Sequence, residues 1–116
     1  MKPRPTTPFT EWHAELPSTM DRARELAIAG APSGTVVVAN YQSAGRGTHG
    51  RIWLAPPNTC LMFTLITRPT LPISKLDTLP LRVSQSIAGY LRDDLGVDCH
   101  VKPPNDIMVG DRKLCG

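Results

Sequence analysis

The sequence predicts an α+β fold in which helices pack on one face of a mixed β-sheet. Two observations lead to this class: helical segments and apolar strand-like runs follow one another irregularly, and glycine and proline separate them. The predicted order is helix, strand, glycine-rich loop, strand, long helix, strand and hairpin. A chain of 116 residues forms one domain at most, and 41% hydrophobic residues suffice for a core.

The first half of the chain predicts one helix and two strands. Residues 18–30 have a narrow apolar stripe, and Ser18 or Thr19 can cap the start of this helix. Residues 35–41 and 60–67 are apolar runs with little alternation. Such runs are typical of strands that are buried on both faces.

The second half predicts a long helix, a strand and a hairpin. Residues 74–95 have helical character, with Ser74 as the candidate N-cap. Pro80 removes a backbone donor, so a break or kink is expected there. In residues 97–102, apolar and polar side chains alternate as they do in a strand. Residues 107–109 and 113–115 flank a Gly-Asp-Arg turn, as in a hairpin.

Composition narrows the classes of partner. The net charge is only +3 and no long run of Lys or Arg occurs, so the charge alone is compatible with a nucleic acid or with an anionic small substrate. Because the sequence contains no helix-turn-helix segment, no nucleic-acid partner is expected. Cys60, Cys99 and Cys115 form no C-x-x-C pair, which favours free thiols in a reducing compartment over a disulfide framework or a zinc site. The start of the chain lacks an apolar signal region, and no apolar stretch is long enough to cross a membrane. We therefore expect a cytoplasmic protein with no membrane partner.

The loop at residues 42–51 contains the pattern G-x-G-x-x-G. A dinucleotide-binding loop would open a helix after the last glycine, but two prolines follow within a few residues. A nucleotide P-loop is also excluded, because no Gly-Lys-Ser/Thr sequence is present. Two explanations stay open: Gln42, Arg46 and Arg51 form a site for an anionic ligand, or the arginines are solvated at a surface turn.

Blocks of sequence that cover nearly the whole chain from residue 18 onward resemble the biotin–protein ligase family in composition and in order. The blocks are S-T-M-D at 18–21, G-T-V-V-V-A at 34–39, Q-S-A-G-R-G at 42–47, G-R-I-W at 50–53, K-P-P-N-D at 102–106 and R-K-L-C-G at 112–116. The family usually has K-W-P-N-D and R-K-L-A-G in the last two places. One such block is weak evidence, but several in the right order are strong evidence.

The resemblance implies a class II aminoacyl-tRNA synthetase-like biotin/lipoate ligase fold. Residues 1–116 would be part of the catalytic domain, with residues 1–8 as a loose N-terminal arm, and we expect the chain to be a fragment. The implied reaction uses ATP and Mg²⁺ to convert biotin into biotinyl-5'-AMP, and then transfers biotin to a lysine of a biotin carboxyl carrier protein or domain. A homodimer is one oligomeric state compatible with the resemblance.

The resemblance also assigns roles to individual residues. The biotin site would contain Ser18, Thr19, Met20, Gln42, Arg46, Gly47, Thr48, Lys113 and Gly116. The ATP or adenylate site would contain Arg46, Arg51, Trp53, Lys102 and Asn105. Catalysis would depend on Lys113, Arg46 and Lys102, and Asp106 would help to hold Mg²⁺.

Most of these residues also have a purely structural explanation. Ser18 and Thr19 can simply cap a helix, and Trp53 can belong to the core. Asn105 follows two prolines, and asparagine is common in turns at such positions. Lys113 at a hairpin would normally be solvated.

Three positions depart from the family pattern. Met20 replaces a frequent asparagine and removes a polar contact near biotin. Thr48 replaces a frequent arginine, so the adenylate would be retained less well. Pro103 replaces the tryptophan of K-W-P-N-D and removes aromatic surface from the nucleotide side. The alternatives are a lipoate or octanoate ligase or transferase of the same superfamily, against which the Gly-Arg-Gly-x-x-Gly-Arg-x-Trp loop argues, and a non-catalytic truncated relative.

Overall fold

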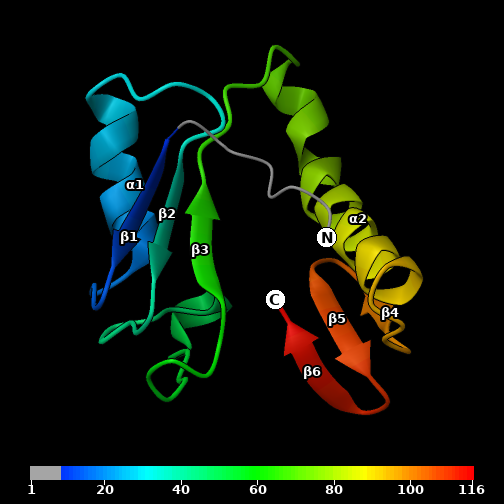
Figure 1. Cartoon of the computed structure of the whole chain (residues 1–116). Coiled ribbons are helices and arrows are strands. Elements are labelled where there is room, and N and C mark those ends of the chain that lie inside the picture. Colours follow the sequence, from blue (N-terminus) through cyan, green and yellow to red (C-terminus); the bar gives the residue numbers. More distant parts are fainter. Residues whose placement is uncertain (1–8) are drawn as a thin grey trace. The chain divides into compact units, whose positions relative to one another are not determined.

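The computed structural model describes residues 9–116 and divides the chain into two compact units, residues 1–69 and 70–116. Each unit combines helix with a three-stranded sheet, so the predicted α+β class is confirmed (Figure 1). The strands form two sheets, a mixed one in the first unit and an antiparallel one in the second. The expected N-terminal arm, residues 1–8, lies outside the described residues.

The first unit is built on the sheet order β1-β2-β3, from strands Thr10–His13, Val36–Ala39 and Met62–Leu65. β1 runs parallel to β2, and β3 runs antiparallel to it. β2 and β3 were predicted, at slightly greater length, whereas β1 was not. Its four residues, Thr-Glu-Trp-His, form no apolar run, and only pairing with β2 makes them a strand.

Helix α1 (Thr19–Ile28) packs against β2 and β3 on one face of this sheet. Ser18 is the N-cap: its hydroxyl accepts a hydrogen bond from the backbone N–H of Met20 at 3.2 Å, as the sequence predicted. At the other end, the guanidinium of Arg68 donates to the carbonyls of Ala27 and Ala31. Carbonyls near a helix end lack helical partners, so Arg68 satisfies groups that α1 itself cannot.

The core of the first unit lies between α1 and the sheet. Its buried members are Ala23, Val37 and Ile66, and partly buried Leu and Ala side chains surround them. β2 is buried as predicted, but β3 is not buried on both faces: Phe63 is 48% exposed and Leu65 is 49% exposed. The prediction for β3 was wrong because α1 covers only one face of this sheet.

The second unit begins with two consecutive helices where one was predicted. A 3₁₀ helix, η2 (Ile73–Thr78), is followed by α2 (Leu79–Asp93), whose first turn contains Pro80. The predicted break at Pro80 is therefore confirmed, because proline is tolerated only in the first turn of a helix. Ser74 is not the N-cap: Pro72 precedes η2, and no side chain caps it.

The sheet of the second unit is the antiparallel meander β4-β5-β6, from strands His100–Lys102, Asp106–Val109 and Arg112–Cys115. The predicted hairpin is confirmed, and Gly110 adopts φ of +58° in its turn. β4 begins later than predicted, because the backbone N–H of Val97 bonds to Leu91 of α2. The core between α2 and this sheet contains Ala88, Cys99 and Ile107.

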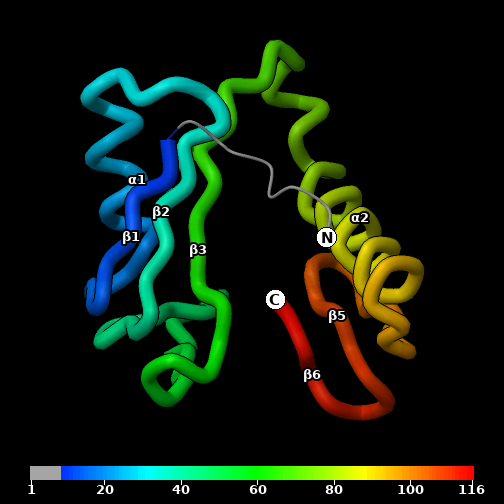
Figure 2. The backbone as a smooth tube through the Cα atoms, in the orientation of Figure 1, coloured from blue at the N-terminus to red at the C-terminus, as the bar shows by residue number. Residues whose placement is uncertain are grey.

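The long connection between β2 and β3 contains the glycine loop and a single 3₁₀ turn, η1 (Thr48–Gly50), and its path can be followed in Figure 2. Cys60, Cys99 and Cys115 are free thiols, as predicted. Within residues 9–116, no helix is long and apolar enough to span a bilayer.

Candidate ligand-binding site

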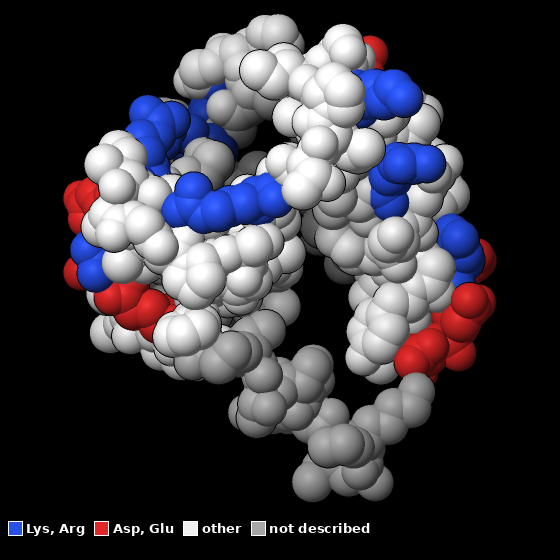
Figure 3. Space-filling view, turned by 90° about the horizontal axis from the view of Figure 1, so that it is seen from above, with Lys and Arg blue, Asp and Glu red and all other residues white. Residues whose placement is uncertain are grey.

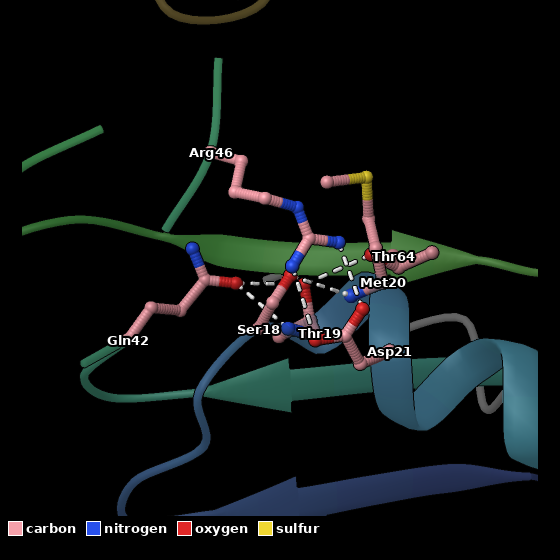
Figure 4. A network of polar contacts seen from close by, with 7 residues as sticks. All are labelled: Ser18, Thr19, Met20, Asp21, Gln42, Arg46 and Thr64. Atoms are coloured by element: carbon pink, nitrogen blue, oxygen red, sulfur yellow. Dashed lines mark hydrogen bonds and ion pairs between the residues drawn. The ribbon is translucent and has the colours of Figure 1, made fainter. Parts of the chain in front are cut away.

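Two of the predicted biotin residues of the first unit, Thr19 and Gln42, belong to a compact group of hydrogen bonds at the start of α1 (Figure 4). Gln42 Oε1 accepts from the backbone N–H of Thr19 at 2.8 Å and from the Thr19 hydroxyl at 3.0 Å. Thr19 Oγ1 also lies 2.8 Å from the hydroxyl of Thr64 on β3. We call Thr19, Gln42 and Thr64 the hydroxyl–amide cluster.

The direction of the hydrogen bonds in this cluster follows from simple chemistry. A backbone N–H can only donate, so the Gln42 atom that faces Thr19 is the amide oxygen. That oxygen can only accept, so the Thr19 hydroxyl gives its one proton to Gln42. Thr64 is therefore the donor to Thr19. The cluster keeps the amide N–H groups of Gln42 and the lone pairs of Thr64 for other partners.

Strand pairing brings Gln42 to the helix. The parallel pairing of β1 with β2 continues as a bridge between Leu16 and Gln42. The backbone N–H of Ser43 bonds to Leu16, and that of Ala44 bonds to Pro17. These bonds fix Gln42 beside Ser18 and Thr19, whose exposed fractions are only 1% and 3%. The same two residues thus cap or start α1 and contribute to the site.

The glycine loop is a small hairpin of its own. The backbone N–H of Gly47 bonds to Arg51 at 2.7 Å, and that of Trp53 bonds to Gly45 at 2.9 Å. Gly45 is buried, and a Cβ placed on it would lie 2.7 Å from the carbonyl oxygen of Trp53. This approach requires glycine at position 45. Thr48 and Arg51 are exposed on the loop, whereas Trp53 is half-buried.

Arg46 reaches from this loop to the first turn of α1 (Figure 4). Its guanidinium donates from Nη2 to Asp21 Oδ1 at 2.8 Å and from Nη1 to Asp21 Oδ2 at 3.1 Å. These hydrogen bonds hold the pKa of the Asp21 carboxyl below its ordinary value and raise the pKa of Arg46. Both groups are charged at neutral pH, so this is a bidentate ion pair.

In the second unit, the predicted catalytic lysines lie on one small sheet. Lys113 Nζ on β6 lies 3.0 Å from Asp106 Oδ1 on β5, an ion pair with side chains 40% and 25% exposed. Lys102 on β4 is the register partner of Asp106, so the sheet gathers all three residues. Lys102 is exposed. Of the two lysines, Lys113 forms the ion pair with Asp106, whereas Lys102 is placed opposite Asp106 by the backbone register.

Two further predicted residues line one pocket of the second unit. Asn105 and Gly116 border it with Cys115, and apolar side chains of α2 such as Val83 and Ile87 form its wall. Burial raises the pKa of the Cys115 thiol. Mostly apolar walls with one amide are typical of a site for a flat, weakly polar group.

The remaining charged side chains do not indicate a second binding site. Basic side chains on the face shown in Figure 3 form several separate groups among uncharged residues. Within residues 9–116, no cluster of three or more His, Cys, Asp or Glu could hold a metal ion by itself.

Sequence reasoning missed two residues of the site. Thr64 carries a hydroxyl in an otherwise apolar strand, and this polar residue was the signal from which its place in the site could have been inferred. Asp21 belongs to the S-T-M-D block but was given no role of its own in the site, and nothing in the sequence links it to Arg46. Met20, predicted at the biotin site, lies in the first turn of α1 and is 46% exposed.

Comparison with known proteins places the chain in a family. The sequence model of the "Biotin/lipoate A/B protein ligase family" matches residues 12–116. The Bacillus subtilis protein named "Bifunctional ligase/repressor BirA" is 36% identical over 105 residues, which cover 90% of this chain and 32% of that protein. The Escherichia coli protein of the same name is 38% identical over 98 residues, covering 84% of this chain and 29% of the relative.

Solved structures give the same picture. Biotin protein ligase from Leishmania major in complex with biotin superposes with a TM-score of 0.79 at 28% identity, over 91% of this chain and 48% of that one. The Aquifex aeolicus biotin protein ligase in complex with biotin and ATP superposes with a TM-score of 0.76 at 30% identity, over 90% of this chain and 43% of that one.

The chain spans about a third of the length of the curated relatives that it matches. The match nevertheless covers nearly all of the chain, including every residue predicted for the site. The chain therefore belongs to the biotin/lipoate A/B protein ligase family.

Proposed function

We propose that this chain is part of a biotin–protein ligase, which activates biotin with ATP and transfers it to a lysine of a biotin carboxyl carrier protein or domain. The observation that carries the proposal is the hydroxyl–amide cluster. Solved relatives bound to biotin, to biotinyl-5-AMP and to biotin with ATP support it.

The cluster favours biotin over lipoate on chemical grounds. The head group of biotin is a cyclic urea with one carbonyl acceptor and two N–H donors. The amide N–H groups of Gln42 can donate to that carbonyl, and the lone pairs of Thr64 can accept from an N–H. The dithiolane ring of lipoate offers no comparable donors or acceptors. Sites built to hydrogen-bond a ligand discriminate strongly against analogues that leave their polar groups unpaired.

The proposed reaction has two displacement steps. A carboxylate oxygen of biotin attacks the α-phosphorus of ATP, and pyrophosphate leaves as biotinyl-5'-AMP forms. The amine of the carrier lysine then attacks the carbonyl carbon of this mixed anhydride; AMP leaves, and the nitrogen loses a proton to give the amide. Both steps develop negative charge on oxygen, which fixed cations such as Arg46, Lys102 and Lys113 would stabilise.

On the nucleotide side, we propose that Asn105 and the apolar pocket of the second unit receive the adenine. Trp53 and Arg51 of the glycine loop are proposed as further nucleotide-binding residues on the resemblance to the family alone. Lys102 would contact phosphate, and Lys113 would bind the biotin carboxylate and then the oxygens of the acyl phosphate that the carboxylate forms. Gly116, at the edge of the same pocket, would let ligand and backbone approach closely. Gly47 would offer its backbone on the glycine loop, and Thr48 would leave the adenylate less firmly held there.

Mg²⁺ fits this site only in part. Asp106 is a single carboxylate, and it is paired with Lys113. Mg²⁺ is often bound by one or two carboxylates together with substrate phosphates and water, so Asp106 could hold it once ATP is present. The ion would neutralise phosphate charge. We propose the cytoplasm as the place of action, because ATP is available there and the three cysteines are free.

Adenylate formation tests the proposal directly. The chain is incubated with biotin and α-phosphate-labelled Mg-ATP, with lipoate in a parallel reaction, and products are separated by thin-layer chromatography. We expect any adenylate to be biotinyl-AMP and not lipoyl-AMP, and we expect this chain alone to give little of it, because it spans only about a third of the relatives that it matches. Adenylate from lipoate instead would contradict the choice of substrate. Biotin binding by calorimetry without adenylate calls for the same test on a chain extended past Gly116: adenylate from the longer chain would identify a fragment of an enzyme, and none would identify a binding relative that lacks the reaction.

A further inference from the structure

The ion pair between Arg46 and Asp21 joins two parts of the chain that are 25 positions apart. Arg46 belongs to the glycine loop, and Asp21 belongs to the first turn of α1. Each terminal nitrogen of the guanidinium donates to one carboxylate oxygen, and such a two-bonded fork fixes the plane of the guanidinium as well as its position. The Arg46 charge therefore has a defined place beside the hydroxyl–amide cluster (Figure 4).

This contact uses only one edge of the guanidinium. Among residues 9–116, the side-chain hydrogen bonds of Arg46 all go from Nη1 and Nη2 to Asp21. Arginine has five N–H donors, so the edge formed by Nε and its neighbouring terminal nitrogen can still bind a second anion. Asp21 and a ligand carboxylate can then bind Arg46 at the same time.

We propose that Asp21 is a positioning residue, which holds Arg46 and the glycine loop against α1 and directs the free edge of the guanidinium toward the anionic group of the ligand. The identity of that ligand rests on the proposed function. In this role Asp21 acts through Arg46 and does not contact the ligand itself.

If Asp21 instead competed with the ligand for Arg46, removing its charge would change ligand binding in the opposite direction. If Asp21 occupied the place of the ligand carboxylate, it would compete for Arg46, and removing its charge would strengthen ligand binding. If it positions Arg46, removing its charge weakens binding, and only for ligands that carry the anion. Both side chains of the pair are 48% exposed, so its loss should leave the unit folded.

The test compares two ligands on matched variants. Biotin and biotinol, in which a hydroxymethyl group replaces the carboxylate, are titrated by calorimetry into the wild-type chain, Asp21→Asn and Asp21→Glu. The control is Glu25→Gln, which removes a carboxylate from the same helix, where it pairs with Arg22. We expect Asp21→Asn to weaken biotin binding roughly three- to fivefold, the range of an exposed ion pair. Biotinol binding should not change, Asp21→Glu should restore most of the biotin affinity, and the control should match the wild type.

An unchanged ratio of biotin to biotinol affinity in Asp21→Asn overturns the proposal, as does tighter biotin binding. Hydrogen exchange of the loop amides provides a readout that needs no ligand. The amides of Gly47 and Trp53 are hydrogen-bonded inside the loop, and we expect them to exchange faster in Asp21→Asn than in Glu25→Gln. If the wild type binds neither compound, the proposed function fails, and hydrogen exchange alone tests whether Asp21 positions Arg46. Equal exchange rates of the loop amides in Asp21→Asn and Glu25→Gln would overturn that role.

Discussion

The two units hold their candidate site residues in different ways. In the first unit, Thr19 is almost fully buried, and its hydroxyl joins Gln42 to Thr64 across three segments. In the second unit, Lys102 and Lys113 are exposed, and the half-buried Asp106 lies between them on the sheet. Folding therefore organises the proposed head-group residues of the first unit, whereas we expect the exposed lysines of the second unit, proposed to contact phosphate, to depend more on a ligand for their order.

The largest expected effect on stability is at the glycine loop. Gly45→Ala would place a methyl group 2.7 Å from the Trp53 carbonyl oxygen, so backbone must move. We expect the free energy of unfolding to fall by about 1–3 kcal/mol, as for other overpacked positions. Chemical denaturation measures this. The matched control is Gly89→Ala in α2, where a Cβ meets nothing within 4 Å; it should be neutral or stabilising, and equal losses in both variants would contradict the argument.

The next largest effect is expected at the hydroxyl–amide cluster. Thr19→Val keeps the shape of the side chain but removes the hydroxyl that bonds Gln42 and Thr64. Gln42 Oε1 keeps its hydrogen bond from the backbone N–H of residue 19, but the Thr64 hydroxyl loses its acceptor. Leaving such a group unpaired costs about 1–3 kcal/mol, so we expect reduced stability and weaker biotin binding. Thr19→Ser retains the hydroxyl and should lose clearly less of both. Similar biotin affinities in the two variants, measured by calorimetry, would mean that the cluster does not organise the head-group site.

A smaller effect is expected at the ion pair of the second unit. Lys113 and Asp106 are partly exposed, and ion pairs of this kind contribute less than about 1 kcal/mol. A double-mutant cycle with Lys113→Ala and Asp106→Ala, followed by denaturation, should give a coupling energy in that range. A coupling energy of several kcal/mol would mean that folding organises the proposed phosphate-binding residues of the second unit as firmly as it organises the hydroxyl–amide cluster of the first. The difference between the two units would then disappear.

The smallest effect is an acid-dependent loss of stability in the first unit. Hydrogen bonds from Arg22, with a further contribution from His13, lower the pKa of Glu11 from 4.5 to about 2. A carboxyl whose pKa is depressed on folding stabilises the folded state above its unfolded pKa. That contribution is lost as pH falls from 4.5 toward 2. The thermal midpoint of the wild type should decrease more across this window than that of Glu11→Gln; parallel curves would show that this pair does not contribute.

Local signals in the sequence were sufficient for several elements. The Ser18 cap, the break at Pro80 and the hairpin after Asn105 follow from capping, from the missing proline donor and from a glycine in a tight turn, and all three are present. β1 and the exposed face of β3 could not be predicted in this way. Strand pairing for β1 and the position of α1 for β3 decided them, and neither is encoded within a few neighbouring residues.

For the site, the sequence by itself determined which residue types are available: a glycine loop with two arginines, and the blocks that contain Lys102, Asn105 and Lys113. Only the tertiary structure decided how these groups are used. It added Thr64 and Asp21 to the site, gave the hydroxyl–amide cluster its donor direction, and paired each of two candidate cations with a carboxylate. The physical reason is that hydrogen bonds and ion pairs depend on distance and direction between side chains, which are set only when α1 has packed on the sheet of the first unit and β5 has paired with β6 in the second.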